Sequence, residues 1–446
     1  MERYRVADRM NRLPVSKFTI GVCACMFIGW MCEAIDLGMT SYMLPTLSKY
    51  WGMTPDVAGW YASTCFIGML IGSLFGGPLA DKVGRKPTIM VFMVVAAVAN
   101  IGLAISPSLE ILFVFRAILG IGLGVQFPVA VAYISESLPA SQRGRYVALY
   151  QLFLPIGMAI AALLVTCLLN HIGWQGLYWI CAIPGLWFIA VWKVCPESTM
   201  WLESKGRIKE ADDIMTNVWE KHAITSLEAK GKGSELAPVV STNPPQTGKV
   251  SIIDLFKGKQ LPLTILAILF MFCAQQSDYG LTTWLTTLFV SKGYTVTTST
   301  LFVLMGILGG IPGYFLSAWG VNKVGRKWAC MIACVFSGVF GILYGFSNSE
   351  IMIVIVGFLY NMGKYAVAMC FLVYMPELFS TALRASGNGL SSAGGRFGSI
   401  LGAPIMAFVM TTTGSPESTF IYAAVLVFIA AILVVILGPE TRNKVF

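Results

Sequence analysis

The sequence predicts an all-α, polytopic membrane protein with twelve transmembrane helices, arranged as two pseudo-symmetric six-helix bundles. Three observations predict this fold: the composition, the spacing of the apolar segments and an internal repeat. Of the 446 residues, 56% are hydrophobic and only 12% are charged, and the mean hydropathy is +0.73. Soluble domains carry about 25% charged residues. A chain this apolar is therefore expected to lie in a membrane.

The apolar residues gather in segments, most of which are long enough for the ~20 residues that a membrane-spanning helix needs. Polar and charged residues separate one segment from the next. We expect twelve spans, over residues 18–47, 57–79, 88–106, 110–134, 145–170, 174–194, 262–290, 298–320, 328–347, 350–375, 386–412 and 418–437.

The positive charges are distributed unequally between the two sides of the predicted membrane. Of the 31 Lys and Arg residues, 26 lie in the N-terminal segment, in the connections on one side and in the C-terminal segment. Only Lys49 and Lys292 lie in the opposite connections, and Arg116, Lys364 and Arg396 lie inside spans. Cytoplasmic loops carry the excess of Lys and Arg. We therefore expect both termini in the cytoplasm and attribute the net charge of +9 to this bias, not to a nucleic-acid partner.

The second half of the chain repeats the first at an almost constant offset. Two parallel six-helix repeats are typical of secondary transporters, whose substrate lies between the halves near the middle of the membrane. The matched landmarks are Gly84-Arg85-Lys86 with Gly325-Arg326-Lys327, Glu136 with Glu377 and Arg143 with Arg384 at 241 residues, Asp36-Leu37-Gly38 with Asp278-Tyr279-Gly280 at 242, and Pro196-Glu197 with Pro439-Glu440 at 243.

The repeat predicts three parts: residues 1–194 as the N-terminal six-helix bundle, 195–260 as a cytoplasmic loop, and 261–446 as the C-terminal six-helix bundle. Within the loop, Ile208–His222 is expected to form an amphipathic interfacial helix. Thr225–Lys249 is rich in Gly, Ser, Pro and Lys and is expected to be flexible.

The first span contains two carboxylates, Glu33 and Asp36, which share one face of a helix. A carboxylate at membrane depth is costly and faces a partner or a water-filled path. The pair either joins two helices or forms a proton or substrate site. The repeat singles out Asp36, because its counterpart Asp278 is also an aspartate, whereas Glu33 corresponds to Gln275.

At the level of motifs, the chain resembles the major facilitator superfamily, and within it the sugar-porter-like branch. Gln151 and the pair Gln275-Gln276 match positions that contact substrate in that branch. The tenth span departs from sugar porters because no Trp stands in the stretch before Glu377, and Asp278 and Lys364 are unexpected in a site for a neutral sugar. The motifs that carry the resemblance are Gly77…Asp81…Gly84-Arg85-Lys86, Arg116…Gly120…Gly124, Pro196-Glu197-Ser198…Trp201-Leu202 and Pro439-Glu440-Thr441.

A second resemblance is to nicotinate-permease-like carriers and, in the eleventh span, to the organic anion and cation transporters. In those transporters the position matching Arg396 tends to be basic in anion carriers, so Arg396 implies an anionic substrate. The motifs are Arg12-Leu13-Pro14-Val15-Ser16-Lys17-Phe18, Gly29-Trp30-Met31, Glu33-Ala34-Ile35-Asp36 and Pro376-Glu377-Leu378-Phe379…Arg384…Gly387…Gly389…Ser391-Ser392…Arg396…Gly398-Ser399.

The resemblance implies proton-coupled import of a small organic anion, such as an aromatic or heterocyclic carboxylate, by alternating access in the bacterial inner membrane. A sugar or polyol symporter, an organic cation carrier and a transport-inactive sensor remain as alternatives. For proton coupling we expect a buried pair of Asp36 with Arg116, assisted by Glu33. The alternative for Arg116 is a helix-end arginine that extends to the membrane surface.

The candidate residues also have purely structural alternatives. The three acids inside spans balance the three bases, polar side chains in spans commonly hydrogen-bond between helices, and aromatic side chains commonly pack. The candidate substrate residues are Arg396, Gln151, Gln275, Gln276, Asp278, Tyr279, Trp284, Lys364, Asn361 and Gln126. The candidate cytoplasmic gate consists of Asp81, Arg85, Glu136, Arg143, Arg145, Glu197, Arg326, Glu377, Arg384 and Glu440.

Enzyme and pump signatures are missing from the sequence. It has no phosphate-binding Gly-Lys-Ser/Thr loop, and its eleven Cys show no metal-ligand spacing and are expected to pack as small apolar residues. We therefore expect a transporter that is not an enzyme and that binds no cofactor and no metal. Its partners would be a small-molecule substrate, protons and the lipid bilayer, and it would act as a monomer.

Overall fold

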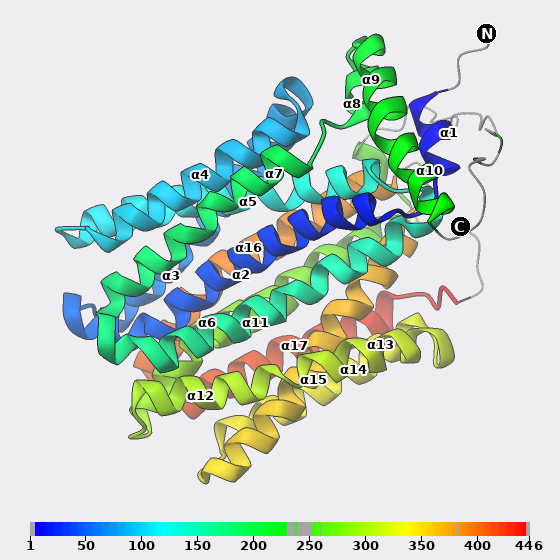
Figure 1. Ribbon diagram of the computed structural model, residues 1–446. Helices are drawn as coiled ribbons and strands as arrows, with labels where there is room; N and C mark the ends of the chain where they lie inside the picture. The colour runs from blue at the N-terminus through cyan, green and yellow to red at the C-terminus, as the bar shows by residue number, and fades with distance from the viewer. Residues whose placement is uncertain are drawn as a thin grey trace. The chain divides into compact units, whose positions relative to one another are not determined.

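The computed structural model describes residues 5–229, 236, 238, 252–258, 260–380 and 383–442. Every regular element in these ranges is a helix (Figure 1). The first part contains α1 (Val6–Asn11), α2 (Lys17–Trp51), α3 (Pro55–Val83), α4 (Arg85–Ala104), α5 (Leu109–Glu136), α6 (Ala140–Ala182), η1 (Ile183–Trp187) and α7 (Phe188–Val194). The remaining helices are α8 (Thr199–Ser204), α9 (Ile208–Ile214), η2 (Met215–Glu220), α10 (Lys221–Glu228), η3 (Ile252–Phe256), α11 (Gln260–Ser291), α12 (Val296–Ile307), α13 (Gly310–Lys323), α14 (Arg326–Gly345), α15 (Glu350–Glu377), α16 (Arg384–Thr413) and α17 (Glu417–Leu437).

The helices confirm the predicted spans. Within the described residues, eleven continuous helical stretches are long and apolar enough to cross a membrane, and one of them, Ala140–Val194, has 55 residues. At about 1.5 Å per residue, that stretch is far longer than the ~30 Å hydrocarbon core of a bilayer. Gly173 breaks it, with φ 69° and ψ −179°. The stretch therefore holds two spans, the predicted segments 145–170 and 174–194, and the described part of the chain has twelve spans in all.

The loop between the two sequence halves also contains helices among its described residues. Helical structure predicted over Ile208–His222 is present as α9, η2 and α10, and its place at the membrane interface stays a prediction. Thr225–Glu228, predicted to be flexible, instead continues α10. Apart from residues 236 and 238, the rest of that predicted flexible stretch, residues 230–249, lies outside the described residues.

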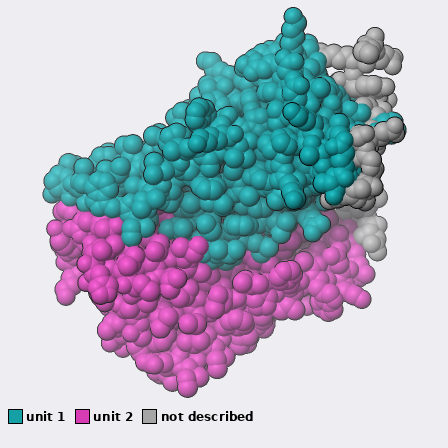
Figure 2. Space-filling view, viewed as in Figure 1, with its two compact units in different colours: residues 1–35, 67–157, 178–245 teal, residues 36–66, 158–177, 246–446 magenta. Residues whose placement is uncertain are grey.

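The chain forms two compact units (Figure 2). Unit 1 comprises residues 1–35, 67–157 and 178–245, and unit 2 comprises residues 36–66, 158–177 and 246–446. The helices α2, α3 and α6 therefore contribute to both units. Each unit has its own apolar core, which includes Trp30 and Tyr133 in unit 1 and Phe270 and Tyr374 in unit 2. The three-part division at residues 194 and 260 remains a prediction.

Close helix packing repeats between the two units at the offset found in the sequence. Small residues permit such close approach between membrane helices. In unit 1, a side chain in place of either of two glycines on α3 would meet the backbone of α5. In unit 2, a side chain in place of either of two glycines at the start of α13 would meet the backbone of α15. The pairs are Gly68 with the carbonyl of Ala117, Gly72 with Ile121, Gly309 with Phe358 and Gly313 with Met362.

Candidate functional site

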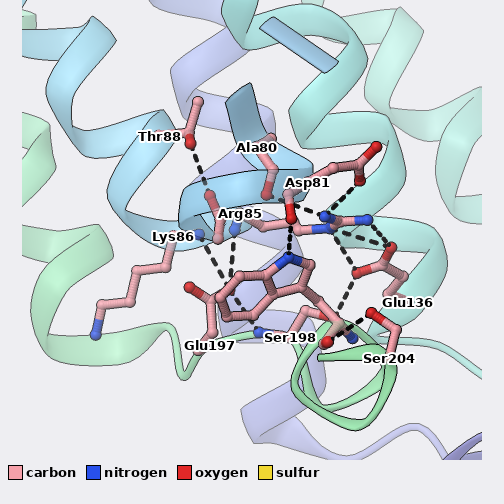
Figure 3. A network of polar contacts seen from close by, with 11 residues as sticks. Ala80, Asp81, Arg85, Lys86, Thr88, Glu136, Glu197, Ser198 and Ser204 are labelled. Atoms are coloured by element: carbon pink, nitrogen blue, oxygen red, sulfur yellow. Dashed lines mark hydrogen bonds and ion pairs between the residues drawn. The ribbon is translucent and has the colours of Figure 1, made fainter. Parts of the chain in front are cut away.

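Four of the predicted gate residues meet in unit 1, where we name Asp81, Arg85, Glu136 and Glu197 the N-terminal polar cluster (Figure 3). The Arg85 guanidinium lies 3.0 Å from Glu136 Oε1 and 2.8 Å from Asp81 Oδ1. Ser198 Oγ donates a further hydrogen bond to Glu136. The cluster thus joins the end of α3, the start of α4, the end of α5 and the segment before α8.

The backbone around Gly84 explains why Glu197 belongs to the N-terminal polar cluster. The first N–H groups of a helix lack partners within the helix and attract negative charge. Glu197 Oε1 accepts hydrogen bonds from the N–H groups of Arg85 at 3.0 Å and Lys86 at 3.2 Å. Gly84 has φ 118°, and a side chain there would overlap the Glu197 carboxylate. Burial raises the pKa of Glu197, and this effect outweighs the backbone hydrogen bonds that lower it.

The equivalent C-terminal polar cluster in unit 2 contains Arg326, Glu377 and Glu440. Arg326 Nε lies 3.2 Å from Glu377 Oε2, and the Arg326 N–H donates to Glu440 Oε1 at 2.9 Å. Thr441 Oγ1 donates to Glu377 Oε2 at 2.5 Å, as Ser198 does to Glu136. The repeat recognised in the sequence is therefore present in the hydrogen bonds of both clusters.

Three further predicted gate residues, Arg143, Arg145 and Arg384, lie outside both ion-pair sets. Arg143 Nε donates to the carbonyl of Leu138, and Arg384 Nε donates to that of Pro376, each at 3.1 Å. Both arginines thus hold the turn that precedes their own helix. Arg145 is exposed.

Sequence reasoning missed a brace in unit 1 between the N-terminal segment and the loop helices. The side chain of Arg9 contacts Asp212 at 3.1 Å and Glu220 at 3.0 Å, and Arg12 contacts Glu220 at 2.6 Å. In Figure 1, α8, α9 and α10 stand beside α1. Burial alone would raise the pKa of Glu220, but hydrogen bonds from both arginines and their charges outweigh burial and lower it. Basic residues before the first span and acidic residues in the loop were the available signal.

A cavity in unit 2 has an ion pair at its wall. Its lining includes Thr282, Tyr360, Asn361, Lys364 and Tyr365. Lys364 Nζ lies 2.7 Å from Asp278 Oδ1 and 3.1 Å from Thr282 Oγ1. Thr282 Oγ1 in turn donates to Asp278 Oδ1 at 3.2 Å. Among the described residues, Lys364 lines this cavity and Asp278 does not.

Other candidate substrate residues of unit 2 already have partners in neighbouring helices. Gln276 Nε2 donates to the Tyr422 hydroxyl at 2.6 Å, and Trp284 Nε1 donates to the Ala403 carbonyl at 2.9 Å. These contacts fix α11 against α17 and α16. Asn361 donates to Gly357 in its own helix at 2.9 Å, and it also lines the cavity of unit 2.

The remaining candidates of unit 2 are Gln275 and Tyr279 on α11 and Arg396 on α16. The Tyr279 ring packs on Phe66 with centroids 4.7 Å apart. Gln275 packs toward Gly395, the residue before the half-buried Arg396.

A second cavity lies within unit 1, where Glu33 and Gln126 are among its lining residues. Gln151 is half-buried in the same unit. Arg116 is buried in unit 1 and Asp36 is buried in unit 2, so the expected Asp36–Arg116 pair remains a prediction. Tyr150 also lines this cavity. Its aromatic side chain in an apolar span gave no signal beyond packing, and sequence reasoning missed it.

Comparisons with known proteins indicate the family of the chain. The sequence profile of the Major Facilitator Superfamily matches residues 26–329 and 308–445. The chain is 33% identical over 446 residues to "Niacin transporter NiaP" of Acinetobacter baylyi, with 98% of each chain covered. It is 27% identical over 422 residues to "Putative niacin/nicotinamide transporter NiaP" of Bacillus subtilis, with 93% of this chain and 95% of the relative covered.

The fold is similar to that of the xylose transporter XylE from E. coli in its partially occluded inward-open conformation. The TM-score is 0.76 at 17% sequence identity, with 97% of this chain and 100% of the XylE chain covered. The profile match and the full-length relatives together establish the family. This chain belongs to the Major Facilitator Superfamily and is a multi-pass membrane transporter of a small molecule.

Proposed function

We propose that the protein imports a small heteroaromatic carboxylate together with a proton, by alternating access, in a bacterial inner membrane with both termini in the cytoplasm. Two relatives whose names contain niacin, a pyridine carboxylate, support this substrate class. The positive charges on the predicted cytoplasmic side support the orientation. The observation that carries the proposal is the Lys364–Asp278 pair at the cavity of unit 2.

Lys364 favours an anionic substrate over the alternatives. Its ammonium lines the cavity, 2.7 Å from the Asp278 carboxylate. A substrate carboxylate entering the cavity meets this positive charge first. An organic cation would instead need Asp278, which Lys364 already holds, and a neutral sugar has no charge to pair with either group. The side chain of Lys364 is 11% exposed, so its charge is poorly screened by water.

The same pair supplies a reason for proton coupling. If a substrate carboxylate bound alone, two carboxylates would face one ammonium in a site of low dielectric, which is costly. If Asp278 takes up one proton, its carboxyl becomes neutral and Lys364 is released to the substrate carboxylate. One anion and one proton then enter together, and the net charge of the cavity stays the same. Release on the other side reverses both steps.

Uptake by reconstituted protein tests the proposal. Proteoliposomes with an alkaline interior should accumulate radiolabelled nicotinate, and Lys364→Gln should abolish saturable uptake. Lys364→Arg, which keeps the positive charge, should retain part of it. Arg396→Ala should weaken the apparent affinity, since Arg396 is the second expected anion anchor. Equal uptake by wild type and Lys364→Gln would contradict the anion site.

A pair of neutral variants locates the proton site. Asp278→Asn should still exchange labelled for unlabelled nicotinate but should no longer accumulate it against its gradient. Asp36→Asn tests the pair with Arg116 expected from the family resemblance. Loss of accumulation in Asp36→Asn with normal accumulation in Asp278→Asn would place coupling at Asp36. It would contradict the proposed protonation of Asp278 and the release of Lys364 to the substrate.

A further inference from the structure

One five-residue sequence occurs twice in the chain, and each time it forms the turn between two helices. Lys82-Val83-Gly84-Arg85-Lys86 joins α3 to α4 in unit 1, and Lys323-Val324-Gly325-Arg326-Lys327 joins α13 to α14 in unit 2. The polar clusters account for the glycine and the arginine of each turn. They do not account for the two lysine side chains and the valine, which recur as well.

In unit 1 these side chains form part of a basic and apolar surface. Lys82 and Val83 are exposed. The Lys86 side chain turns away from the N-terminal polar cluster (Figure 3), and its Nζ donates to the Trp192 carbonyl at 2.8 Å. This contact brings the Lys86 ammonium to the end of α7, where Trp192 is 59% exposed and Lys193 is exposed. Three positive charges therefore lie next to two exposed apolar side chains.

Unit 2 builds the same kind of surface with a different third cation. Lys323 and Val324 are exposed. Lys327 Nζ lies 5.7 Å from the ring centre of Trp328, which is 45% exposed. Arg442 Nη1 donates to the Lys323 carbonyl at 2.6 Å. Both units thus combine three cations with an exposed valine and an exposed tryptophan, although the third cation is not a repeated residue.

The charges of the lysines can serve a partner outside the protein. In both clusters the carboxylates contact the cluster's own arginine or main-chain N–H groups. A lysine ammonium has three donors, so Lys86 keeps two after its bond to Trp192. An anion that approaches either turn therefore meets positive charge.

An anionic phospholipid fits this combination of side chains. Tryptophan is enriched where membrane and water meet, and a lysine there lays its apolar stem along the membrane while its charge reaches the head groups. Basic clusters at the cytoplasmic ends of spans attract anionic lipids, and both turns lie on the predicted cytoplasmic side. A soluble anion would meet the same cations, but it has no apolar part to contact the valine and the tryptophan.

We propose that each turn holds one anionic phospholipid, with its phosphate on the three cations and its acyl chains against the valine and the tryptophan. The inference needs no knowledge of the transported substrate. The N-terminal lipid site consists of Lys82, Val83, Lys86, Trp192 and Lys193, and the C-terminal lipid site consists of Lys323, Val324, Lys327, Trp328 and Arg442.

Native mass spectrometry of the full chain in detergent counts the lipids that stay bound. Wild type titrated with phosphatidylglycerol should retain two molecules, and it should retain phosphatidylcholine much more weakly. Lys82→Gln/Lys86→Gln and Lys323→Gln/Lys327→Gln should each lose one phosphatidylglycerol. The affinity of the altered site should fall about 5-fold for each lysine removed, or about 25-fold for the pair.

Three comparisons separate a lipid site from a general response to charge. Lys205→Gln/Lys221→Gln removes two exposed lysines of the loop on the same predicted side of the membrane and should retain both lipids. Lys82→Arg/Lys86→Arg keeps the charges and should also retain both. Trp192→Ala keeps the carbonyl that holds Lys86 and should weaken retention at the N-terminal lipid site.

Four results would overturn the inference. Equal retention of phosphatidylglycerol and phosphatidylcholine would remove the anionic selectivity, and two lipids on both glutamine pairs would place the lipids elsewhere. Equal loss in Lys205→Gln/Lys221→Gln, or loss in Lys82→Arg/Lys86→Arg, would show an effect of net charge or of a damaged turn. Displacement of the lipid by an equal concentration of glycerol phosphate, which has the phosphate without the acyl chains, would show a site for soluble anions.

Discussion

The N-terminal and C-terminal polar clusters are built alike but differ in one side chain. Both place an arginine after a glycine with positive φ, 118° at Gly84 and 108° at Gly325. Both pair this arginine with a glutamate at the end of a later helix. Asp81 adds a carboxylate 2.8 Å from Arg85 in the first cluster. At the equivalent position of unit 2, Asn322 donates to Ala318 in its own helix.

The comparison of the two clusters separates the residues that occur in both halves of the chain from those that occur in the N-terminal half alone. The glycine, the arginine and the two glutamates recur, so they form the shared framework. Asp81 and the braced helices α8–α10 occur with the N-terminal cluster, where Trp201 Nε1 also donates to the Asp81 carbonyl at 2.8 Å. We therefore expect changes in the framework to destabilise both clusters, to a degree set by the burial of each side chain, and changes in the additions to affect the N-terminal cluster alone.

The largest expected effect is that of the two turn glycines. Gly84→Ala and Gly325→Ala each force a side chain into a positive-φ position and displace a glutamate carboxylate, at a cost of about 3 kcal/mol each. Both should lower the unfolding temperature by similar amounts. The control is Gly77→Ala, where a side chain meets no atom within 4 Å. A normal unfolding temperature for Gly325→Ala beside a low one for Gly84→Ala would break the equivalence of the clusters.

Removal of one glutamate charge from each cluster should show a moderate difference. The side chains of Arg85 and Glu136 are 12% and 19% exposed, against 19% and 32% for Arg326 and Glu377. Glu136→Gln should therefore cost about 2 kcal/mol and Glu377→Gln about 1 kcal/mol. Denaturation of each variant measures its loss of stability, and nicotinate uptake by each variant is measured in parallel. A larger loss of stability for Glu377→Gln would contradict this ranking.

The brace at Glu220 predicts a dependence on pH with a definite sign. Its pKa is lowered in the folded protein, so its pairing with Arg9 and Arg12 stabilises the fold above pH 4.5, the value for the free group. This contribution is lost as the pH falls through the lower pKa of the folded state. Glu220→Gln should reduce stability by about 1 kcal/mol at pH 7.

The difference between wild type and Glu220→Gln should shrink as the pH falls below 4.5. Thermal unfolding at a series of pH values measures it. A difference that grows toward acid pH would contradict the sign. Glu203→Gln is a useful comparison, because Glu203 accepts a hydrogen bond from the backbone N–H of Val6 in α1, at 3.3 Å.

The smallest expected effect belongs to the position at which the clusters differ. Asp81 is 69% exposed, so its ion pair with Arg85 is worth about 0–1 kcal/mol. Asp81→Asn should reduce stability by that amount and more weakly at high salt. Asn322→Asp should give Arg326 the missing carboxylate and raise stability slightly. If Asp81→Asn raises stability or Asn322→Asp lowers it, the helices around the clusters, and not this side chain, cause the difference.

The fold and both clusters could be predicted because they follow from local rules. Segment lengths set the spans, and landmarks such as Gly84 and Glu136 repeat at fixed spacing. The contact of Lys364 with Asp278 could be foreseen only as one possible pairing among three acids and three bases, because sequence does not show which charges meet. The brace from Arg9 to Glu220 joins residues 211 apart, and Tyr150 has no charge or motif to mark it. Both needed the tertiary structure.

Movement of protons with the substrate tests the central claim most directly. Proteoliposomes that hold a pH-sensitive dye, with no imposed gradient, receive external nicotinate, and protein-free liposomes correct for nicotinic acid that crosses the lipid alone. The account predicts acidification of the interior by wild type, and none by Asp278→Asn although that variant still exchanges nicotinate. Nicotinate uptake by wild type without acidification, or acidification that persists in Asp278→Asn, would contradict it.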